Sequence, residues 1–117
     1  MTYMFEGDRN AFLKLLNDNK GVMIFKYTAD WCKPCQMIKT EVDAHFKKIT
    51  GPTVFCFEVN IDECFDLFSF MKTKKMIKGI PTLMAYKKGN TSFVPDDSIS
   101  GADIGDVNSF FERCTKM

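Results

Sequence analysis

No apolar run in this 117-residue sequence approaches the roughly 20 residues that a membrane-spanning helix requires. The stretch MTYMFEGDRN at the start has no basic segment followed by an apolar one, so it predicts no secretory signal. An excess of one charge is also missing, because 16 basic and 15 acidic side chains leave a net charge of +1. Domains that bind nucleic acid usually carry a basic excess. We therefore expect neither a membrane nor a nucleic acid as a partner.

Cysteine is too sparse and too unevenly spaced to predict a structural disulfide framework. The chain has five cysteines, an odd number, which favours a reducing compartment such as the cytoplasm. A zinc site would need a second pair of ligands. Cys56, Cys64 and Cys114 are not paired at metal spacing, and His45 is the single histidine, so we expect no bound metal.

Hydrophobic residues make up 45% of the chain and aromatic residues 14%, which is typical of a globular protein. At this length we expect one domain over residues 1–117. Strand-like and helix-like segments alternate and then end in a hairpin and a helix, which predicts an α/β sandwich with a mixed sheet. The predicted strands cover residues 2–5, 22–28, 53–61, 82–86 and 92–94, and residues 95–101 are predicted to form a polar loop. The predicted helices begin at Asp8, Pro34, Asp62 and Asp103.

Two of these helices carry several apolar residues, and in the first of them these form a stripe that we expect to face inward. In the helix over residues 34–49 the stripe comprises Met37, Ile38, Val42 and Phe46. The helix after Asp62 carries Phe65, Leu67, Phe68 and Met71. The strand over residues 22–28 is almost continuously apolar, which is typical of a strand covered on both faces.

The segment ADWCKPCQ, residues 29–36, places two cysteines at the predicted junction between a strand and a helix. At a helix N-terminus, unpaired N–H groups and the helix dipole favour the thiolate of Cys32, the form that attacks disulfides. Cys35 lies within the first turn, near enough to close a disulfide. Pro34 stiffens that turn and Lys33 adds a positive charge that favours the thiolate. The segment predicts reversible dithiol–disulfide chemistry, with half of a metal site and a pair of inert buried thiols as the alternatives.

ADWCKPCQMIK followed by KGIPTLMAYKKG resembles the thioredoxin family, in a WCKPC variant, and the likeness covers nearly the whole chain in order. The resemblance implies a mixed five-stranded sheet of order 1-3-2-4-5 with helices on both faces. It also implies that Pro81 is a cis proline beside the dithiol and that Ile80 pairs with the substrate backbone. Trp31 would shield the site, and Lys33 and Pro34 would complete the substrate-binding surface.

The resemblance further implies a protein-disulfide reductase that needs no bound cofactor. Cys32 would attack a disulfide in a partner protein, and Cys35 would resolve the mixed disulfide. A thioredoxin reductase or an equivalent electron donor would then restore the dithiol. Two other functions stay open: a disulfide oxidase or isomerase, which Lys33 allows by stabilising the thiolate, and a binding module of the same fold whose redox chemistry is secondary.

The sequence departs from the family at two positions on neighbouring strands. Lys26 stands where thioredoxins usually have a buried aspartate, and Glu58 stands where they have a lysine. An unpaired lysine in the apolar segment MIFKYT would be costly, so we expect an exchanged ion pair. Our hypothesis is that Glu58, or neutral Lys26, takes the proton of Cys35. The alternative is that Lys26 reaches the surface and Glu58 is a solvated strand residue.

Two further features allow a functional and a structural interpretation. MKTKKMIK, residues 71–78, places four lysines just before the Ile-Pro motif, either to attract acidic partners or as a solvated helix face. Cys64 is either a regulatory thiol or an ordinary, partly buried cysteine. Cys56 and Cys114 are expected to lie in the core.

Overall fold

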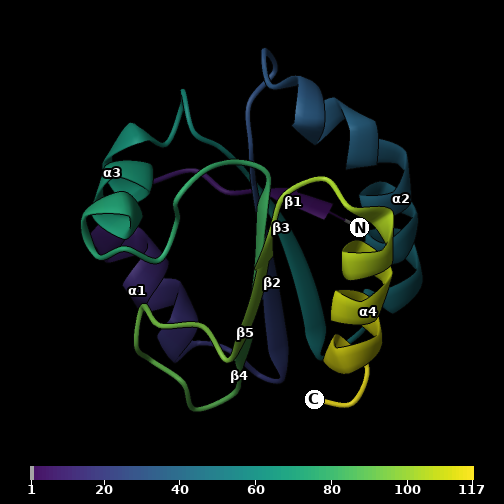
Figure 1. The fold of residues 1–117 in the computed structure, drawn as a ribbon. Helices are drawn as coiled ribbons and strands as arrows, with labels where there is room; N and C mark the ends of the chain where they lie inside the picture. The colour runs from purple at the N-terminus through teal and green to yellow at the C-terminus, as the bar shows by residue number, and fades with distance from the viewer. Residues whose placement is uncertain (1) are drawn as a thin grey trace.

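In the computed structural model, which describes residues 2–117, one sheet lies between two pairs of helices (Figure 1). The strands are β1 (Thr2–Met4), β2 (Val22–Thr28), β3 (Val54–Asn60), β4 (Thr82–Lys87) and β5 (Asp97–Ser100). The helices are α1 (Arg9–Asn17), α2 (Lys33–Ile49), α3 (Phe65–Thr73) and α4 (Ile104–Cys114). The element order confirms the predicted alternation of strands and helices.

The sheet has the order β1-β3-β2-β4-β5, which confirms the order that the family resemblance implied. β3 pairs in parallel with β1 and with β2, whereas β4 pairs antiparallel with β2 and β5. Parallel neighbours need a crossover connection, and the helices α1 and α2 supply it. β2 therefore lies at the centre of a mixed sheet, which explains why all seven of its residues are buried.

Alternate residues of β2 face opposite layers of helices. Phe25 and Tyr27 belong to a core under α1 and α3, while Val22 and Ile24 belong to a second core under α2 and α4. Figure 1 shows the two helix pairs on opposite sides of the sheet. Burial of both faces is why the sequence of β2 reads as a continuous apolar run rather than an alternating one.

The helix starts follow local capping, with one difference from the sequence prediction. Asp8 and Asp103 cap α1 and α4, each accepting a hydrogen bond of 2.9 Å from a backbone N–H three residues later. α3 begins after Cys64 and not at Asp62. The Asn60 side chain accepts from the Asp62 N–H at 3.0 Å and holds these residues in a turn, which delays the helix.

Two large apolar residues of α2 and α3 are exposed, and one of them, Met37, was predicted to face inward. Met37 is 63% exposed, because the buried face of α2 is the narrow stripe through Ile38, Val42 and Phe46. Phe65 is 69% exposed. It precedes the buried residue Leu67 by two positions, about 200° around a helix of 3.6 residues per turn. The inward position predicted for Met37 was wrong, because apolar character alone does not give the width of a helix face.

The last strand lies later in the chain than predicted. Residues 92–94 form no strand, and β5 lies within the segment predicted to be a loop. Asn90 and Asp96 hold the connection after β4: the Asp96 carboxylate accepts from the Lys87 N–H at 2.7 Å and from the Asn90 side chain at 3.0 Å. β5 is an edge strand whose residues alternate between half-buried and exposed, so its sequence carries little apolar signal.

Candidate active site

Cys32 and Cys35 form a disulfide at the junction of β2 and α2, with their Cα atoms 5.2 Å apart. Cys32 is the N-cap residue of α2, and its Sγ accepts a hydrogen bond of 3.2 Å from the Cys35 N–H. Pro34 lies in the first turn, where its missing N–H costs nothing. After reduction, the same N–H and the helix dipole stabilise a negative charge on the Cys32 sulfur.

Both cysteines are buried, Cys35 slightly more than Cys32. Cys35 is 1% exposed and Cys32 is 4% exposed, so Cys32 is the one nearer to solvent. Lys33 and Pro34, which lie between them, are both exposed. Of the two cysteines, Cys32 is therefore the one closer to the surface.

A second segment lies directly against Cys32. The Ile80–Pro81 peptide bond is cis, and the carbonyl oxygen of Ile80 lies 3.8 Å from Cys32 Sγ. The Thr82 hydroxyl donates to the Gly79 carbonyl at 2.7 Å, which holds the turn before β4. Within residues 2–117 the backbone N–H of Ile80 has no hydrogen-bond partner. An unpaired backbone group beside the disulfide is available to a bound chain.

Trp31 stands beside the disulfide with 67% of its surface exposed. Its indole Nε1–H donates to Asp62 Oδ2 at 2.8 Å, which fixes the ring over the β3–α3 turn. The sequence interpretation missed Asp62 in this role. The indole N–H needs an acceptor, but no local pattern indicates which carboxylate supplies it.

Lys26 and Glu58 lie opposite each other in the parallel register of β2 and β3. The Lys26 Nζ and Glu58 Oε1 atoms are 3.5 Å apart. The Lys26 side chain is 2% exposed and that of Glu58 is 22% exposed. The expected contact is present, and the alternative in which Lys26 reaches the surface is wrong.

The three other cysteines are buried and unbridged. Burial raises the pKa of the Cys56 and Cys114 thiols to about 12. Burial also raises the pKa of Cys64, whose S–H donates to the Phe5 carbonyl at 3.3 Å. These thiols stay protonated near neutral pH and do not compete with the dithiol as nucleophiles.

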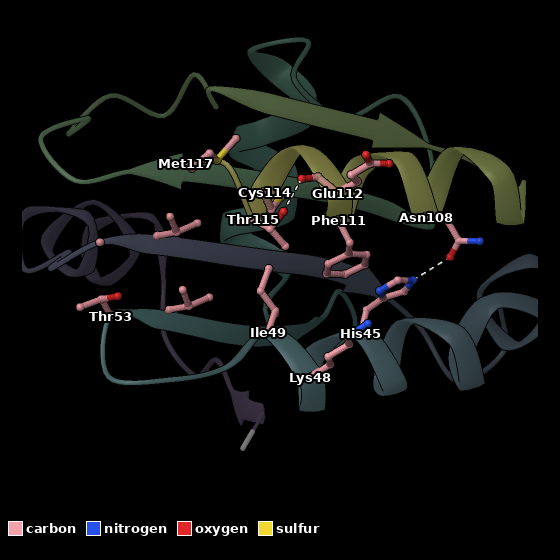
Figure 2. Close-up of a pocket in the computed structure, with 13 residues that line it drawn as sticks. His45, Lys48, Ile49, Thr53, Asn108, Phe111, Glu112, Cys114, Thr115 and Met117 are labelled. Atoms are coloured by element: carbon pink, nitrogen blue, oxygen red, sulfur yellow. Dashed lines mark hydrogen bonds between the residues drawn. The ribbon is translucent and has the colours of Figure 1, made fainter.

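A cavity of about 670 Å³ lies between the C-terminal halves of α2 and α4, at the start of β2 (Figure 2). The His45 ring stacks on Phe111 with centroids 4.5 Å apart and shares a hydrogen bond of 2.7 Å with Asn108 Oδ1. The dithiol lies at the other end of both α2 and β2, so this cavity is separate from it. Across the part of the chain that the structure describes, no cluster of three or more His, Cys, Asp or Glu side chains is arranged to hold a metal ion.

A mixed five-stranded sheet with a disulfide at a strand–helix junction, faced by a cis proline, defines a thiol–disulfide oxidoreductase of the thioredoxin fold. The Thioredoxin family model matches residues 4–110, and the chain belongs to the thioredoxin family. Its Cys32–Cys35 pair is the redox-active disulfide, and the protein is a protein-disulfide reductase of the thioredoxin type.

Relatives from distant organisms support the assignment. Thioredoxin of Pseudomonas aeruginosa is 33% identical over 84 residues, which cover 72% of this chain and 73% of that protein. Thioredoxin of Equus caballus is 31% identical over 96 residues, covering 81% and 82% of the two chains. The solved structure of Fasciola hepatica thioredoxin superposes with a TM-score of 0.72 at 27% identity, covering 95% and 97%. Of the helices formed by residues 2–117, none has the length and apolarity to cross a membrane.

Proposed function

We propose that the chain reduces disulfides in partner proteins, with Cys32 as the nucleophile and Cys35 as the resolving thiol. The observation that carries this proposal is the position of Cys32. It caps α2, it is the more exposed of the two cysteines, and its Sγ lies 3.8 Å from the carbonyl oxygen of Ile80.

The reaction balances as two exchanges. The Cys32 thiolate attacks one sulfur of the substrate disulfide, and the other sulfur leaves as a thiolate that takes up a proton. Cys35 then loses its proton and attacks Cys32, which breaks the mixed disulfide and releases the second substrate thiol. The substrate gains two electrons, the Cys32–Cys35 pair loses two, and a thioredoxin reductase or equivalent donor returns them.

The substrate chain would lie along the turn before β4. The free N–H and the carbonyl of Ile80 would pair with its backbone, and Pro81 would hold that turn against the dithiol. Trp31, Lys33 and Pro34 would form the opposite rim of the site. This arrangement recognises backbone more than side chains, so it suits many protein substrates.

We propose that Glu58, in its ion pair with Lys26, accepts the proton of Cys35. Glu58 is the partly exposed member, so it can accept a proton from the interior and pass it to water. Lys26 keeps that carboxylate oriented from 3.5 Å.

The three buried cysteines that remain unbridged favour a reducing compartment, and we propose the cytoplasm.

Trapping of the mixed disulfide tests the assignment of the two thiols. Cys35→Ser should form a stable covalent adduct with a disulfide-containing protein, whereas Cys32→Ser should form none. Adduct formation by Cys32→Ser and not by Cys35→Ser would reverse the roles.

Equilibration of the pair against defined thiol buffers tests the direction of the reaction. A potential near the roughly −270 mV of thioredoxins fits a reductant. A potential near about −180 mV would indicate an isomerase or oxidase instead.

A further inference from the structure

Four exposed lysines lie in the segment that runs from the last turn of α3 to the active-site turn. We call them the lysine surface; they are Lys72, Lys74, Lys75 and Lys78. All four side chains are exposed, and within residues 2–117 none of them has an ion-pair partner. The acidic residue of α3, Asp66, is bound to Arg9 at 2.9 Å and does not neutralise them. The surface therefore keeps its positive charge.

Aromatic rings hold part of this charge in place. The Lys72 ammonium lies 5.5 Å from the centre of the Phe68 ring. The Lys74 ammonium lies 5.9 Å from Phe70 and 5.7 Å from Phe93. These distances are in the range of cation–π contacts, which fix the ammonium groups without cancelling their charge.

Stability of the helix does not account for the whole surface. Lys72 is in the last turn of α3, where a positive charge complements the helix dipole. Lys75 and Lys78 lie beyond that turn, and the effect of the dipole fades there. Lys75 also has φ of 62°, a conformation that glycine or asparagine adopts more easily. Lysine is therefore not favoured by this backbone conformation, but it does add a positive charge.

In the chain, the lysine surface ends two residues before the segment that contacts the dithiol. Lys78 is two residues before Ile80, whose carbonyl oxygen lies 3.8 Å from Cys32 Sγ. The chain from Lys75 to Ile80 spans at most about 17 Å, the length of five extended residues. A substrate segment of five or six extended residues is therefore long enough to reach from Ile80 to Lys75.

We infer that the lysine surface selects substrates that carry an acidic segment next to the disulfide to be reduced. This inference rests on the proposed function, because it concerns how substrates reach the same dithiol. Opposite charges would speed the encounter and orient the substrate disulfide toward Cys32.

The experiment compares two synthetic peptides with the same disulfide and length, one with three glutamates beside it and one with three glutamines. The measured quantity is kcat/KM for reduction, with a small-molecule thiol to restore the dithiol. At low salt the protein should reduce the acidic peptide on the order of 10-fold faster. In about 1 M salt, where screening acts within about 3 Å, the advantage should disappear.

Two triple variants test which lysines cause the preference for the acidic peptide. Lys74→Gln, Lys75→Gln and Lys78→Gln together should abolish the preference for the acidic peptide. A second triple variant with substitutions at Lys47, Lys87 and Lys88, also to glutamine, removes the same charge from exposed sites elsewhere and should keep it. Each variant lowers the net charge from +1 by three, so a difference between them reports position and not total charge.

The outcomes separate this inference from the proposed function. Equal rates for the two peptides with the unchanged protein at low salt would overturn the inference, as would an equal loss of preference in both triple variants. Failure of the unchanged protein to reduce even the neutral peptide would overturn the proposed function instead.

Discussion

Replacement of Glu58 by glutamine leaves the Lys26 side chain, which is 2% exposed, without the acidic partner 3.5 Å from its Nζ. At an effective dielectric constant of about 20, a pair at this distance attracts by about 5 kcal/mol. Desolvation offsets part of this, and loss of one partner from a buried pair typically costs about 3–5 kcal/mol. Glu58 is 22% exposed, and water reaching it reduces the effect. We expect Glu58→Gln to lower the free energy of unfolding by about 2 kcal/mol.

Equilibrium unfolding in urea measures this loss, and an unchanged dependence on denaturant would show that the unfolded state is the same. Glu6→Gln is the control, because Glu6 is exposed and outside any ion pair among the described residues, so it should stay within about 0.5 kcal/mol. The double variant Lys26→Met with Glu58→Gln removes both charges and should recover to within about 1 kcal/mol of the original protein.

A Glu58→Gln variant as stable as the original protein would refute the reasoning that the pair is needed inside the sheet. The same variant also tests the proton transfer. Because the proposed proton acceptor acts on Cys35, release of substrate from the mixed disulfide should slow while the first attack by Cys32 keeps its rate. Rapid-mixing kinetics across pH separates the two steps, and unchanged release at every pH would remove Glu58 from the mechanism.

Three further predictions concern the stability of the fold. Gly21→Ala would place a Cβ against the carbonyl oxygen of Thr53 and should cost about 1–3 kcal/mol in urea unfolding; no loss would show that the β2–β3 start can shift freely. Asn19→Ala removes the acceptor for the Gly21 N–H and the donor to a β4 carbonyl, for a cost of about 2 kcal/mol by the same assay. Because burial raises the pKa of the Cys56 and Cys114 thiols from 9.0 to about 12, the fold favours their neutral forms. The free energy of unfolding that this preference contributes is complete below pH 9 and is lost as the pH rises, by about 2 kcal/mol for each thiol at pH 10.5. If the free energy of unfolding falls with pH just as steeply in the double alanine variant, this assignment is contradicted.

The site itself was predictable to the extent that it depends on neighbours in the chain. A strand ends before Cys32 and a helix begins after it, so the sequence places the sulfur at a helix N-terminus. The Gly-Ile-Pro-Thr segment needed the family resemblance, because its contact with Cys32 crosses 48 residues of chain. The carboxylate that holds Trp31 was missed for the same reason, since Asp62 is 31 residues away.

The sequence by itself determined the order of the elements, the buried centre of the sheet and the strand–helix junction that carries the dithiol. Each depends on local signals: apolar periodicity, capping residues and the proline in the first turn of a helix. Only the tertiary structure decided that Phe65 is exposed, that the last strand is Asp97–Ser100, and that Lys26 is buried against Glu58. Those outcomes depend on which surfaces meet across the fold. An edge strand and a buried ion pair are stabilised by residues that are distant in sequence, and a local sequence pattern does not identify those residues.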